Sequence, residues 1–369
     1  VGDLTNMETG YIFKEFFDRT LDTNNYDSRS DNRFLDINKR ENYLFNSTIN
    51  GIEESDFILL LGTNPRYEAT ILNARIRKSY LNNNTKIISL NDLGELTYPY
   101  VSLDGQTQSI KDIFEGNNEI SKKIKEAKKP SIIIGESLLN SNSSKYLFNK
   151  IKEFLIENNK ITEDWNSLNI LSCDASTVGN FDLGIVNQEK RLLNDLKDHK
   201  FDIVYLVGQD SLDFDKKDEF IIYQGSHGDK GAEIADIILP GSAYTEQDGY
   251  FTNLEGKIQK AQKASYPPGD AKEDWQIINE LAEFMNNRKL FNDKDELESS
   301  MFNYLNLQKE KQDNFNEKND HSKNEEFQNE NLKIVIKDYY FSNVIAKSSK
   351  TMIECNNSKI NLKSTGTEG

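Results

Sequence analysis

Six short apolar runs, each about the length of one β-strand, constrain the fold of this chain more than any other feature of its sequence. FILLL and SIIIG are two of them, and their nearly unbroken apolar character is typical of strands buried on both faces of a parallel sheet. The runs occupy residues 56–62, 86–90, 130–137, 167–173, 201–208 and 219–225. Each is far shorter than the roughly 20 apolar residues that cross a bilayer, so we expect no membrane span.

The segments between these runs have the spacing of helices. After the first run, Asn64 can cap a helix and Pro65 suits its first turn. Apolar stripes follow at Ala69, Leu72, Ile76 and Tyr80, and again at Leu147, Ile151, Phe154 and Leu155. The alternation predicts an α/β fold with doubly wound, mostly parallel sheets, in which ligands bind at the carboxyl ends of the strands.

We predict five segments along the chain. They are a loop-rich N-terminal segment (1–50), a first α/β lobe (51–129), a second α/β lobe (130–291), a polar linker (292–331) and a C-terminal docking segment (332–369). The linker contains QKEKQDNFNEKNDHSKNEEFQNEN, which has too few apolar residues to offset its chain entropy, so we expect it to be flexible. The docking segment begins with LKIVIKDYYF, which predicts a strand that packs back on the body.

One more helix is expected late in the second lobe. It would follow Pro267 and Pro268, where Asp270 and Glu273 have the spacing of a capping box. Its apolar face would carry Trp275, Ile278, Leu281 and Met285.

Charge and cysteine content exclude several classes of protein. The chain has 45 Lys and Arg against 61 Asp and Glu, and the net charge of -16 has the wrong sign for binding nucleic acid or anionic lipid. The two cysteines, Cys173 and Cys355, are far apart and outside any CxxC or Cys/His cluster. The sequence therefore encodes neither a disulfide framework nor a metal or cluster site, and a reducing compartment is expected.

The turn LGTNPR, residues 61–66, is the first candidate binding site. The first amides of the next helix are unpaired and attract phosphate, so this turn lies where a nucleotide would bind in an open α/β sheet. Neither GxGxxG nor GxxxxGK[ST] is present. A plain strand-to-helix turn is therefore the stronger interpretation.

The loop GSHGDKG, residues 225–231, is the second candidate. Its Gly225 could let the backbone approach a ligand, and His227 could exchange a proton while Asp229 orients it. No GxSxG elbow is present, and His199 and His321 lie in polar stretches. The stronger interpretation is a loop histidine that hydrogen-bonds the backbone.

The stretch DGYFTNLEGKIQ, residues 248–259, predicts a hairpin or tight loop in which Gly249 and Gly256 have special backbone angles. Acidic residues at Glu246, Asp248 and Glu255 could form a carboxylate site. Their spacing establishes no glycosidase or metal chemistry, so we interpret them as solvent-facing.

Three stretches taken together resemble a known family. They are LGTNPRYEATILNARIRKSYL, then YQGSHGDKGAEIADIILPGSAYTEQDGYFTNLEGKIQ with the residues that follow it, and finally IKDYYFSNVIAKSSKTMIEC. They are similar to the large iron-sulfur subunit of respiratory complex I, a 75-kDa subunit that also has a bacterial form. The similarity extends from near Val1 to about Cys355 and is weaker over residues 18–47, 93–129 and 292–331.

The resemblance implies a molybdopterin oxidoreductase-like fold with Rossmann-like lobes. In catalytic relatives, the positions that match Gly62, Asn64 and Pro65 and the loop 225–229 help to hold a pterin cofactor. In the complex I subunit the fold is retained without pterin or molybdenum. We therefore expect no catalytic residue, cofactor or metal on this chain, and we interpret both loops as remnants of a cofactor pocket.

The resemblance also implies where electron transfer occurs. The family binds its iron-sulfur clusters in its N-terminal half, and two isolated cysteines cannot supply one four-thiolate set. We expect the clusters on that N-terminal half or a partner chain, and this chain, which lacks an initiator methionine, to be the C-terminal half. Its partners would be other peripheral-arm subunits of complex I. The tail and the Asn/Lys/Ile-rich composition favour the matrix side of the mitochondrial inner membrane.

Two alternatives belong to other classes of protein. The chain could be part of a working molybdopterin oxidoreductase whose cluster domain is on another chain, with a pterin held between the Asn64 and His227 loops. It could also be a free-standing nucleotide-binding regulator, although the phosphate-binding fingerprints are missing.

Overall fold

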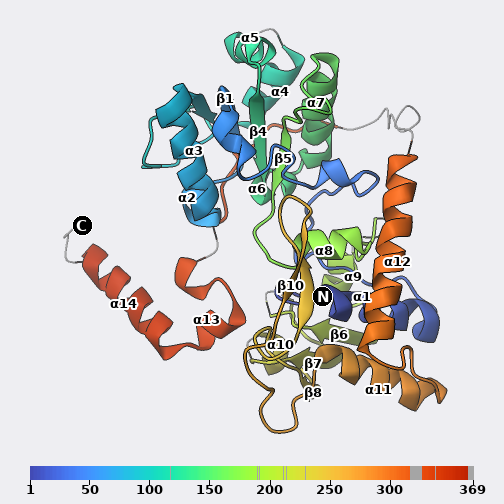
Figure 1. Ribbon diagram of the computed structural model, residues 1–369. Coiled ribbons are helices and arrows are strands. Elements are labelled where there is room, and N and C mark those ends of the chain that lie inside the picture. Colours follow the sequence, from blue (N-terminus) through green and yellow to red (C-terminus); the bar gives the residue numbers. More distant parts are fainter. Residues whose placement is uncertain are drawn as a thin grey trace.

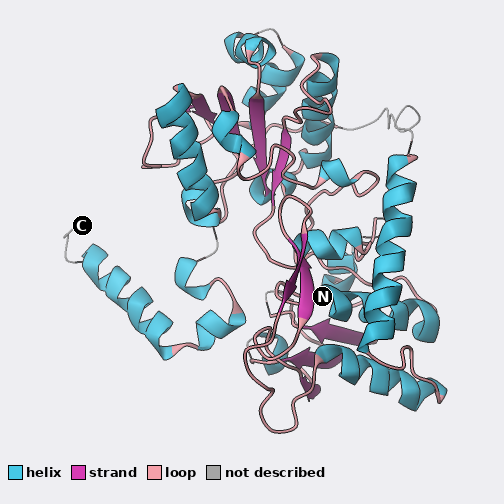
Figure 2. Ribbon diagram, viewed as in Figure 1, coloured by secondary structure: helices cyan, strands magenta, loops and turns pink. Residues whose placement is uncertain are grey.

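The computed structural model contains two parallel sheets that lie at different ends of the molecule, with helices packed around them (Figure 1, Figure 2). It describes all residues except 117, 189, 191, 211, 213, 229, 316–325, 337 and 365–369, with side chains to residue 359. No helix in the described part is long and apolar enough to cross a membrane.

The larger sheet has five parallel strands in the order β3-β2-β1-β4-β5. They are β1 (Phe57–Leu61), β2 (Lys86–Ser89), β3 (Val101–Ser102), β4 (Pro130–Gly135) and β5 (Leu168–Leu171). Because β1 pairs with β2 on one side and with β4 on the other, the direction of winding reverses between β1 and β4. Such a reversal is where open α/β sheets bind ligands. The predicted doubly wound, parallel fold is confirmed.

The helices of this half cover both faces of the sheet, and β1 is buried between them (Figure 1). They are α2 (Pro65–Glu68), α3 (Thr70–Asn83), α4 (Thr107–Glu115), α5 (Glu119–Glu126), α6 (Glu136–Leu139) and α7 (Ser144–Glu157). Leu59 and Leu61 join a core with residues of α4 and α7, whereas Ile58 and Leu60 join the core on the α3 side. Burying each of these side chains contributes roughly 1.5–3 kcal/mol to the stability of the fold.

The predicted division between residues 129 and 130 is wrong. β4 pairs with β1 along five residues, from Phe57 with Pro130 to Leu61 with Ile134, and β5 pairs with β4. A boundary at residue 129 would therefore cut one sheet into two. The sequence could not show this, because strand pairing joins runs that lie about 70 residues apart.

The second half of the molecule is built on a smaller parallel sheet in the order β6-β7-β8. Its strands are β6 (Ile203–Val207), β7 (Phe220–Gly225) and β8 (Ile237–Pro240), and β9 (Gly249–Thr252) pairs with β10 (Ile258–Ala261) as the predicted antiparallel hairpin. Its helices are α1 (Met7–Phe16), α8 (Thr177–Asp182), α9 (Leu192–Lys197), α10 (Lys230–Glu233), α11 (Asp274–Asn286) and α12 (Lys294–Asp313).

The N-terminal segment is only partly loop-rich, which corrects the prediction. α1 lies inside the second core, where Ile12, Phe13 and Phe16 pack with Val207 of β6 and Ile278 of α11. Short 3-10 helices span Arg40–Asn42 and Gly51–Glu54, and residues 22–39 are irregular. The apolar spacing within residues 7–16 was the overlooked helical signal.

The predicted flexible linker is a long helix over much of its length. α12 begins after Asp293, whose carboxylate accepts a hydrogen bond from the Glu296 amide (2.9 Å), and it buries Leu297 and Met301 in the second core. Phe302, Tyr304 and Leu305 of the same helix also pack against this core, so α12 has an apolar face within a largely polar stretch. Residues 316–325 of the predicted linker, including His321, lie outside the described residues.

The start of α11 and the segment after residue 331 also differ from the predictions. α11 begins at Asp274 without the expected capping box, because the Glu273 carboxylate accepts bonds from the Trp275 indole and Lys294 instead. The predicted strand at 332–341 does not form in the described residues. Leu332 is buried in the first core, but the following residues are irregular. A 3-10 turn (Tyr339–Phe341), α13 (Val344–Ser348) and α14 (Lys350–Ser364) then extend away from the body (Figure 1).

Substitution of Gly256 by valine is expected to destabilise the protein by about 2 kcal/mol or more. Gly256 has a φ of +80°, and a Cβ there would lie 2.8 Å from Nη1 of Arg40. Gly249 has no left-handed φ, but Gly249→Val is expected to be damaging because its Cβ would lie 2.3 Å from Nδ2 of Asn6. Denaturant unfolding of the purified variants measures both effects.

The matched control is Gly94→Val, because Gly94 has a φ of +67° and no atom within 4 Å of its Cβ position. The free energy of unfolding of this variant should fall only by the cost of a valine in a left-handed backbone conformation, roughly 1 kcal/mol. Equal losses at Gly94 and Gly256 would contradict the role given to crowding.

Glu8 should make stability depend on pH. Its carboxyl is buried under the β9 hairpin, where one oxygen accepts the Tyr250 amide (2.9 Å) and the other has no partner among the described residues. Burial raises the pKa of Glu8 from 4.5 to about 7, so the folded state binds this proton more tightly than the unfolded state does. The free energy of unfolding should therefore fall as pH rises from 4.5 to 7, by about 3 kcal/mol for this group.

Glu8→Gln removes the titrating group at nearly constant shape. We expect denaturant unfolding of this variant to lose most of the decline between pH 4.5 and 7 and to show higher stability than the unsubstituted protein above pH 7. An unchanged pH profile would contradict the assignment.

Candidate functional site

The turn after β1 is built for close packing of the backbone. Gly62 has a φ of +66°, and a Cβ there would lie 2.6 Å from the amide nitrogen of Leu138 in α6. Gly135, at the end of β4, faces the same turn, because its Cβ would lie 2.4 Å from the carbonyl oxygen of Gly62. The two glycines therefore bring the ends of β1 and β4 together.

The start of α2 confirms the predicted cap but places a carboxylate where a phosphate could bind. The side chain of Asn64 accepts from the Arg66 amide at 3.2 Å, and Pro65 occupies the first turn. The Asn64 amide itself donates to the carboxylate of Glu68, which also accepts from the Thr63 hydroxyl at 2.6 Å. Burial raises the pKa of Glu68. The protein thus fills this anion-binding position with its own side chain.

The turn after β5 has the same construction. The Cys173 amide donates to Oε1 of Glu136 at 3.0 Å, and Glu136 also pairs with the buried guanidinium of Arg33. Arg33 has a second partner in Asp31, at 2.7 Å. Burial alone would lower the pKa of Arg33, but the charges of Glu136 and Asp31 raise it above its usual value. The guanidinium therefore stays positively charged, and the carboxylates of Glu136 and Asp31 balance its charge.

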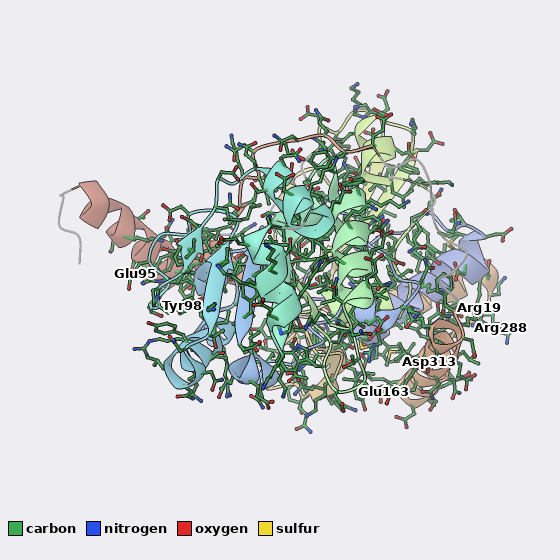
Figure 3. The ribbon with its side chains drawn as sticks, turned by 90° about the horizontal axis from the view of Figure 1, so that it is seen from above. Arg19, Glu95, Tyr98, Glu163, Arg288 and Asp313 are labelled. Carbon is green, nitrogen blue, oxygen red and sulfur yellow. The ribbon has the colours of Figure 1, made fainter. Side chains whose placement is uncertain are left out.

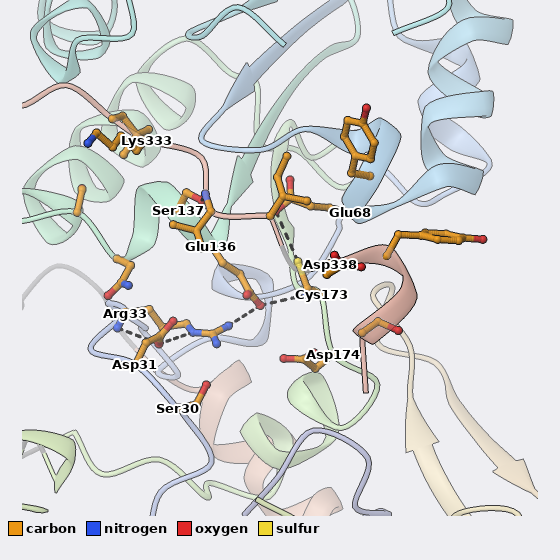
Figure 4. A pocket seen from close by; sticks show the side chains of 18 of the residues that line it. Ser30, Asp31, Arg33, Glu68, Glu136, Ser137, Cys173, Asp174, Lys333 and Asp338 are labelled. Carbon is orange, nitrogen blue, oxygen red and sulfur yellow. Dashed lines mark hydrogen bonds and ion pairs between the residues drawn. The ribbon is translucent and has the colours of Figure 1, made fainter. Parts of the chain in front are cut away.

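A pocket of about 610 Å³ lies at these carboxyl ends, close to the switch point between β1 and β4. Figure 4 shows a continuous series of ion pairs and hydrogen bonds along it, from Asp31 through Arg33 and Glu136 to Cys173. The thiol of Cys173 lies 3.7 Å from Oε1 of Glu68. The pocket thus lies at the carboxyl ends of the strands, where open α/β sheets bind ligands; that this chain binds one there stays a prediction.

Residues 326–335, here named the strap, cross this edge of the sheet and close part of it. The strap accepts hydrogen bonds from the first amides of α4. The Thr107 amide donates to the Glu330 carbonyl (2.9 Å), and the Gln108 amide donates to the Asn329 side chain (2.8 Å). The Glu330 carboxylate also accepts from the Asn142 amide, before α7, at 2.7 Å. The buried side chain of Leu332 anchors the strap in the first core.

The sequence motifs mark the neighbourhood of this pocket but not its lining. Gly62, Asn64 and Pro65 form the adjacent turn, whereas Glu68 and Tyr67 in the following residues line the cavity. The lining residues that sequence reasoning missed include Arg33, Glu68, Glu136, Cys173 and residues of the strap. An acidic residue directly after an apolar strand, as in GES at 135–137, was the available signal.

The GSHGDKG loop lies at the end of β7, in the other sheet, and does not meet the Asn64 turn in this pocket (Figure 1). The Tyr223 hydroxyl lies 2.6 Å from the carbonyl oxygen of His227 and 2.8 Å from Asp210. A Cβ at Gly225 would lie 2.4 Å from that hydroxyl, so this glycine leaves room for the tyrosine.

The side chain of His227 is half-buried, and its Nδ1 lies 3.0 Å from the Ser226 hydroxyl. Asp229 lies outside the described residues, so its predicted pairing with His227 stays a prediction. The His227 ring thus contacts a neighbouring hydroxyl, whereas the His227 backbone carbonyl accepts from Tyr223; a bond from the ring to the backbone stays a prediction.

The three acidic residues near the hairpin do not converge on one site. Glu246 accepts from the Ala243 amide (3.0 Å), Asp248 accepts from the Lys263 amide (2.9 Å), and Glu255 accepts from the Ile49 amide. Glu246 thus stabilises a local turn, whereas Asp248 and Glu255 each join two separate segments of the chain. Among the described residues, no group of three His, Cys, Asp or Glu side chains could hold a metal ion.

Comparison with known proteins identifies two family matches along the chain. Residues 1–284 match the molybdopterin oxidoreductase family, and residues 296–355 match the family of the C-terminal region of the NADH-ubiquinone oxidoreductase G subunit. The 75 kDa subunit of NADH-ubiquinone oxidoreductase from Reclinomonas americana is 34% identical over 96% of this chain and 54% of its own length.

Two further relatives agree with this match. The mitochondrial 78 kDa subunit of NADH-ubiquinone oxidoreductase from Candida albicans is 38% identical over 86% of this chain and 45% of its own length. The G subunit of NADH-quinone oxidoreductase from Rickettsia bellii is 35% identical over 99% of this chain and 53% of its own length. The chain spans about half the length of these curated relatives. It belongs to the molybdopterin oxidoreductase family, and its relatives are the 75 kDa, 78 kDa and G subunits of NADH-ubiquinone and NADH-quinone oxidoreductases.

Proposed function

We propose that this chain is a non-catalytic, structural part of the large iron-sulfur subunit of respiratory complex I. In this role it scaffolds the peripheral arm that passes electrons from NADH to quinone, on the matrix side of the mitochondrial inner membrane. The similarity to complex I subunits over nearly the whole chain supports the assignment, and the mitochondrial relatives support the location.

The observation that carries the non-catalytic part of the proposal is the position of Glu68. In the family, the turn that contains Gly62 and Asn64 would contact an anionic pterin cofactor. Here the Asn64 amide is bonded to the Glu68 carboxylate, and α6 occupies the space beside Gly62. A phosphate brought to this turn would meet a negative charge and would lack a free amide, so these residues do not fit the cofactor.

The cysteines support placing the iron-sulfur clusters on another segment or chain. Cys173 lies in the pocket beside Glu68, whereas Cys355 is exposed on α14. A cluster held by four thiolates needs four converging cysteines, and this chain has two. The chain's contribution to electron transfer is then to hold the cluster-bearing half and neighbouring peripheral-arm subunits in position.

The competing function is a catalytic molybdopterin oxidoreductase with its cluster domain on another chain. It requires a cofactor shared by the Asn64 turn and the GSHGDKG loop. The two loops end strands of different sheets, and the pocket described above is lined by neither Asn64 nor His227. This geometry favours the structural role.

Native gel separation of respiratory membranes, with mass spectrometry and metal analysis of the same band, tests the proposal. We expect this chain to migrate with the NADH-oxidising complex, in a band that contains iron and no stoichiometric molybdenum. Molybdenum at one atom per chain would establish the catalytic alternative. Migration apart from the NADH-oxidising band would reject the assignment to complex I.

His227→Ala supplies a functional test within the assembled complex. The side chain of His227 contacts its neighbour Ser226 on the loop, so its loss should leave NADH-to-quinone turnover per assembled complex unchanged within about twofold. Turnover is normalised to the amount of complex in the native gel. A tenfold loss at normal assembly would show that the loop takes part in the chemistry.

A further inference from the structure

The pocket at the carboxyl edge has an exposed apolar rim. Its lining includes Tyr67 of α2, Val335 at the end of the strap, Ile336 directly after it, and Tyr339 of the 3-10 turn. These side chains are 50%, 76%, 39% and 61% exposed, respectively. Large apolar side chains that gather around a concave site and remain in water mark a surface used for protein contact.

The interior of the same pocket is negatively charged. Six carboxylates and two cations are among its described lining residues, and the cation at its base, Arg33, is already paired with Asp31 and Glu136. The carboxylates of Glu68 and Glu330 have amide partners, which leave their charge in place. Asp338 is exposed at the rim, where it caps the turn before Tyr340 at 2.8 Å. The pocket therefore disfavours phosphates and favours a cation.

Two lysines of α14 have partners outside the pocket. Lys350 lies 4.0 Å from Glu354 on its own helix, and Lys359 lies 5.6 Å from the ring centre of Tyr340. Figure 1 shows α13 and α14 directed away from the body. The segment that leads to them supplies one wall of the pocket but leaves the mouth open.

We propose that this apolar-rimmed, acidic pocket docks a lysine-bearing segment of a neighbouring chain in the same assembly. The ammonium group would lie between Asp338 and the inner carboxylates, and the methylene stem would lie against Tyr67, Val335 and Tyr339. A lysine side chain suits this combination because its stem is apolar and its tip is charged. The two aromatic rings at the rim can add cation-π attraction.

This inference rests on the proposed function, because it takes the partner from the same complex. It adds the place of contact and the chemistry of the partner. A nucleic acid or a membrane of anionic lipid carries the wrong charge for this surface. Charge complementarity thus selects a basic protein segment among the possible occupants.

Carbodiimide coupling of the complex isolated from respiratory membranes tests the contact. This reagent joins a carboxylate to a touching lysine amine, with loss of water, and mass spectrometry of the digest identifies both residues. We expect Asp338 to be coupled to a lysine of another chain. Coupling of Asp338 only to lysines of this chain, or to none, in a complex that contains the chain, would overturn the inference.

Two variants and one control sharpen the result. Asp338→Asn keeps an oxygen that can cap Tyr340 but removes the charge, and it should weaken retention of the partner segment in salt washes by about fivefold. Val335→Asp leaves the Asp338 carboxylate available but disrupts the apolar rim, so coupling at Asp338 should fall. Glu163→Gln removes one charge from an exposed side chain at the periphery (Figure 3) and should change neither readout.

Two failures can be told apart in this experiment. If the chain does not migrate with the NADH-oxidising complex, the proposed function fails and this inference fails with it. If the chain does migrate there and Asp338 contacts no other chain, only the docking inference fails.

Discussion

The pairing of β1 with β4 is the contact on which the larger half of the molecule depends. Both strands are apolar on their two faces, so the side-chain pattern alone does not select a register. The glycines that end the strands supply this constraint, because only residues without a Cβ allow Gly135 to approach the carbonyl of Gly62 so closely. The same approach places the first turns of α2 and α6 side by side and creates the crevice between them.

That crevice exposes helix amides and turn amides that need acceptors. The protein satisfies them with its own carboxylates. Glu68 accepts at the turn after β1, Glu136 accepts from Cys173 at the turn after β5, and Glu330 of the strap accepts from Asn142 before α7. Each carboxylate takes the place of water or a ligand at an amide and loses part of its own hydration. The pKa of Glu68 is raised because this burial disfavours the charged carboxylate. The carboxyl edge of the sheet thereby becomes a structural joint that holds α2, α6 and the C-terminal segment together.

Local features of the sequence were sufficient for six strands of the two parallel sheets, the Asn64 cap and the β9 hairpin, because each depends on residues close in the chain. The six apolar runs do not include β3 and β8. The grouping of strands into sheets was not predictable, because β1 and β4 are brought together by long-range packing. α12 was overlooked for a different reason, because its apolar face, which includes Leu297, Met301 and Leu305, begins a segment whose overall polar composition suggested a linker. Similarly, no local pattern shows that Glu68 turns back onto the Asn64 amide.

The carboxylates that bond the amides at this sheet edge also determine the charge of the pocket surface. Carboxylates that satisfy amides keep their negative charge, and Arg33 compensates only those at the base of the pocket. The remaining charge faces solvent beside Tyr67 and Tyr339, which are themselves incompletely buried. Attraction between such a surface and a basic segment acts before contact and guides its approach, while the apolar rim stabilises the segment once it is in place. The Glu68 carboxylate, which takes up the Asn64 amide, therefore also contributes to the negative charge that we propose attracts a basic protein partner.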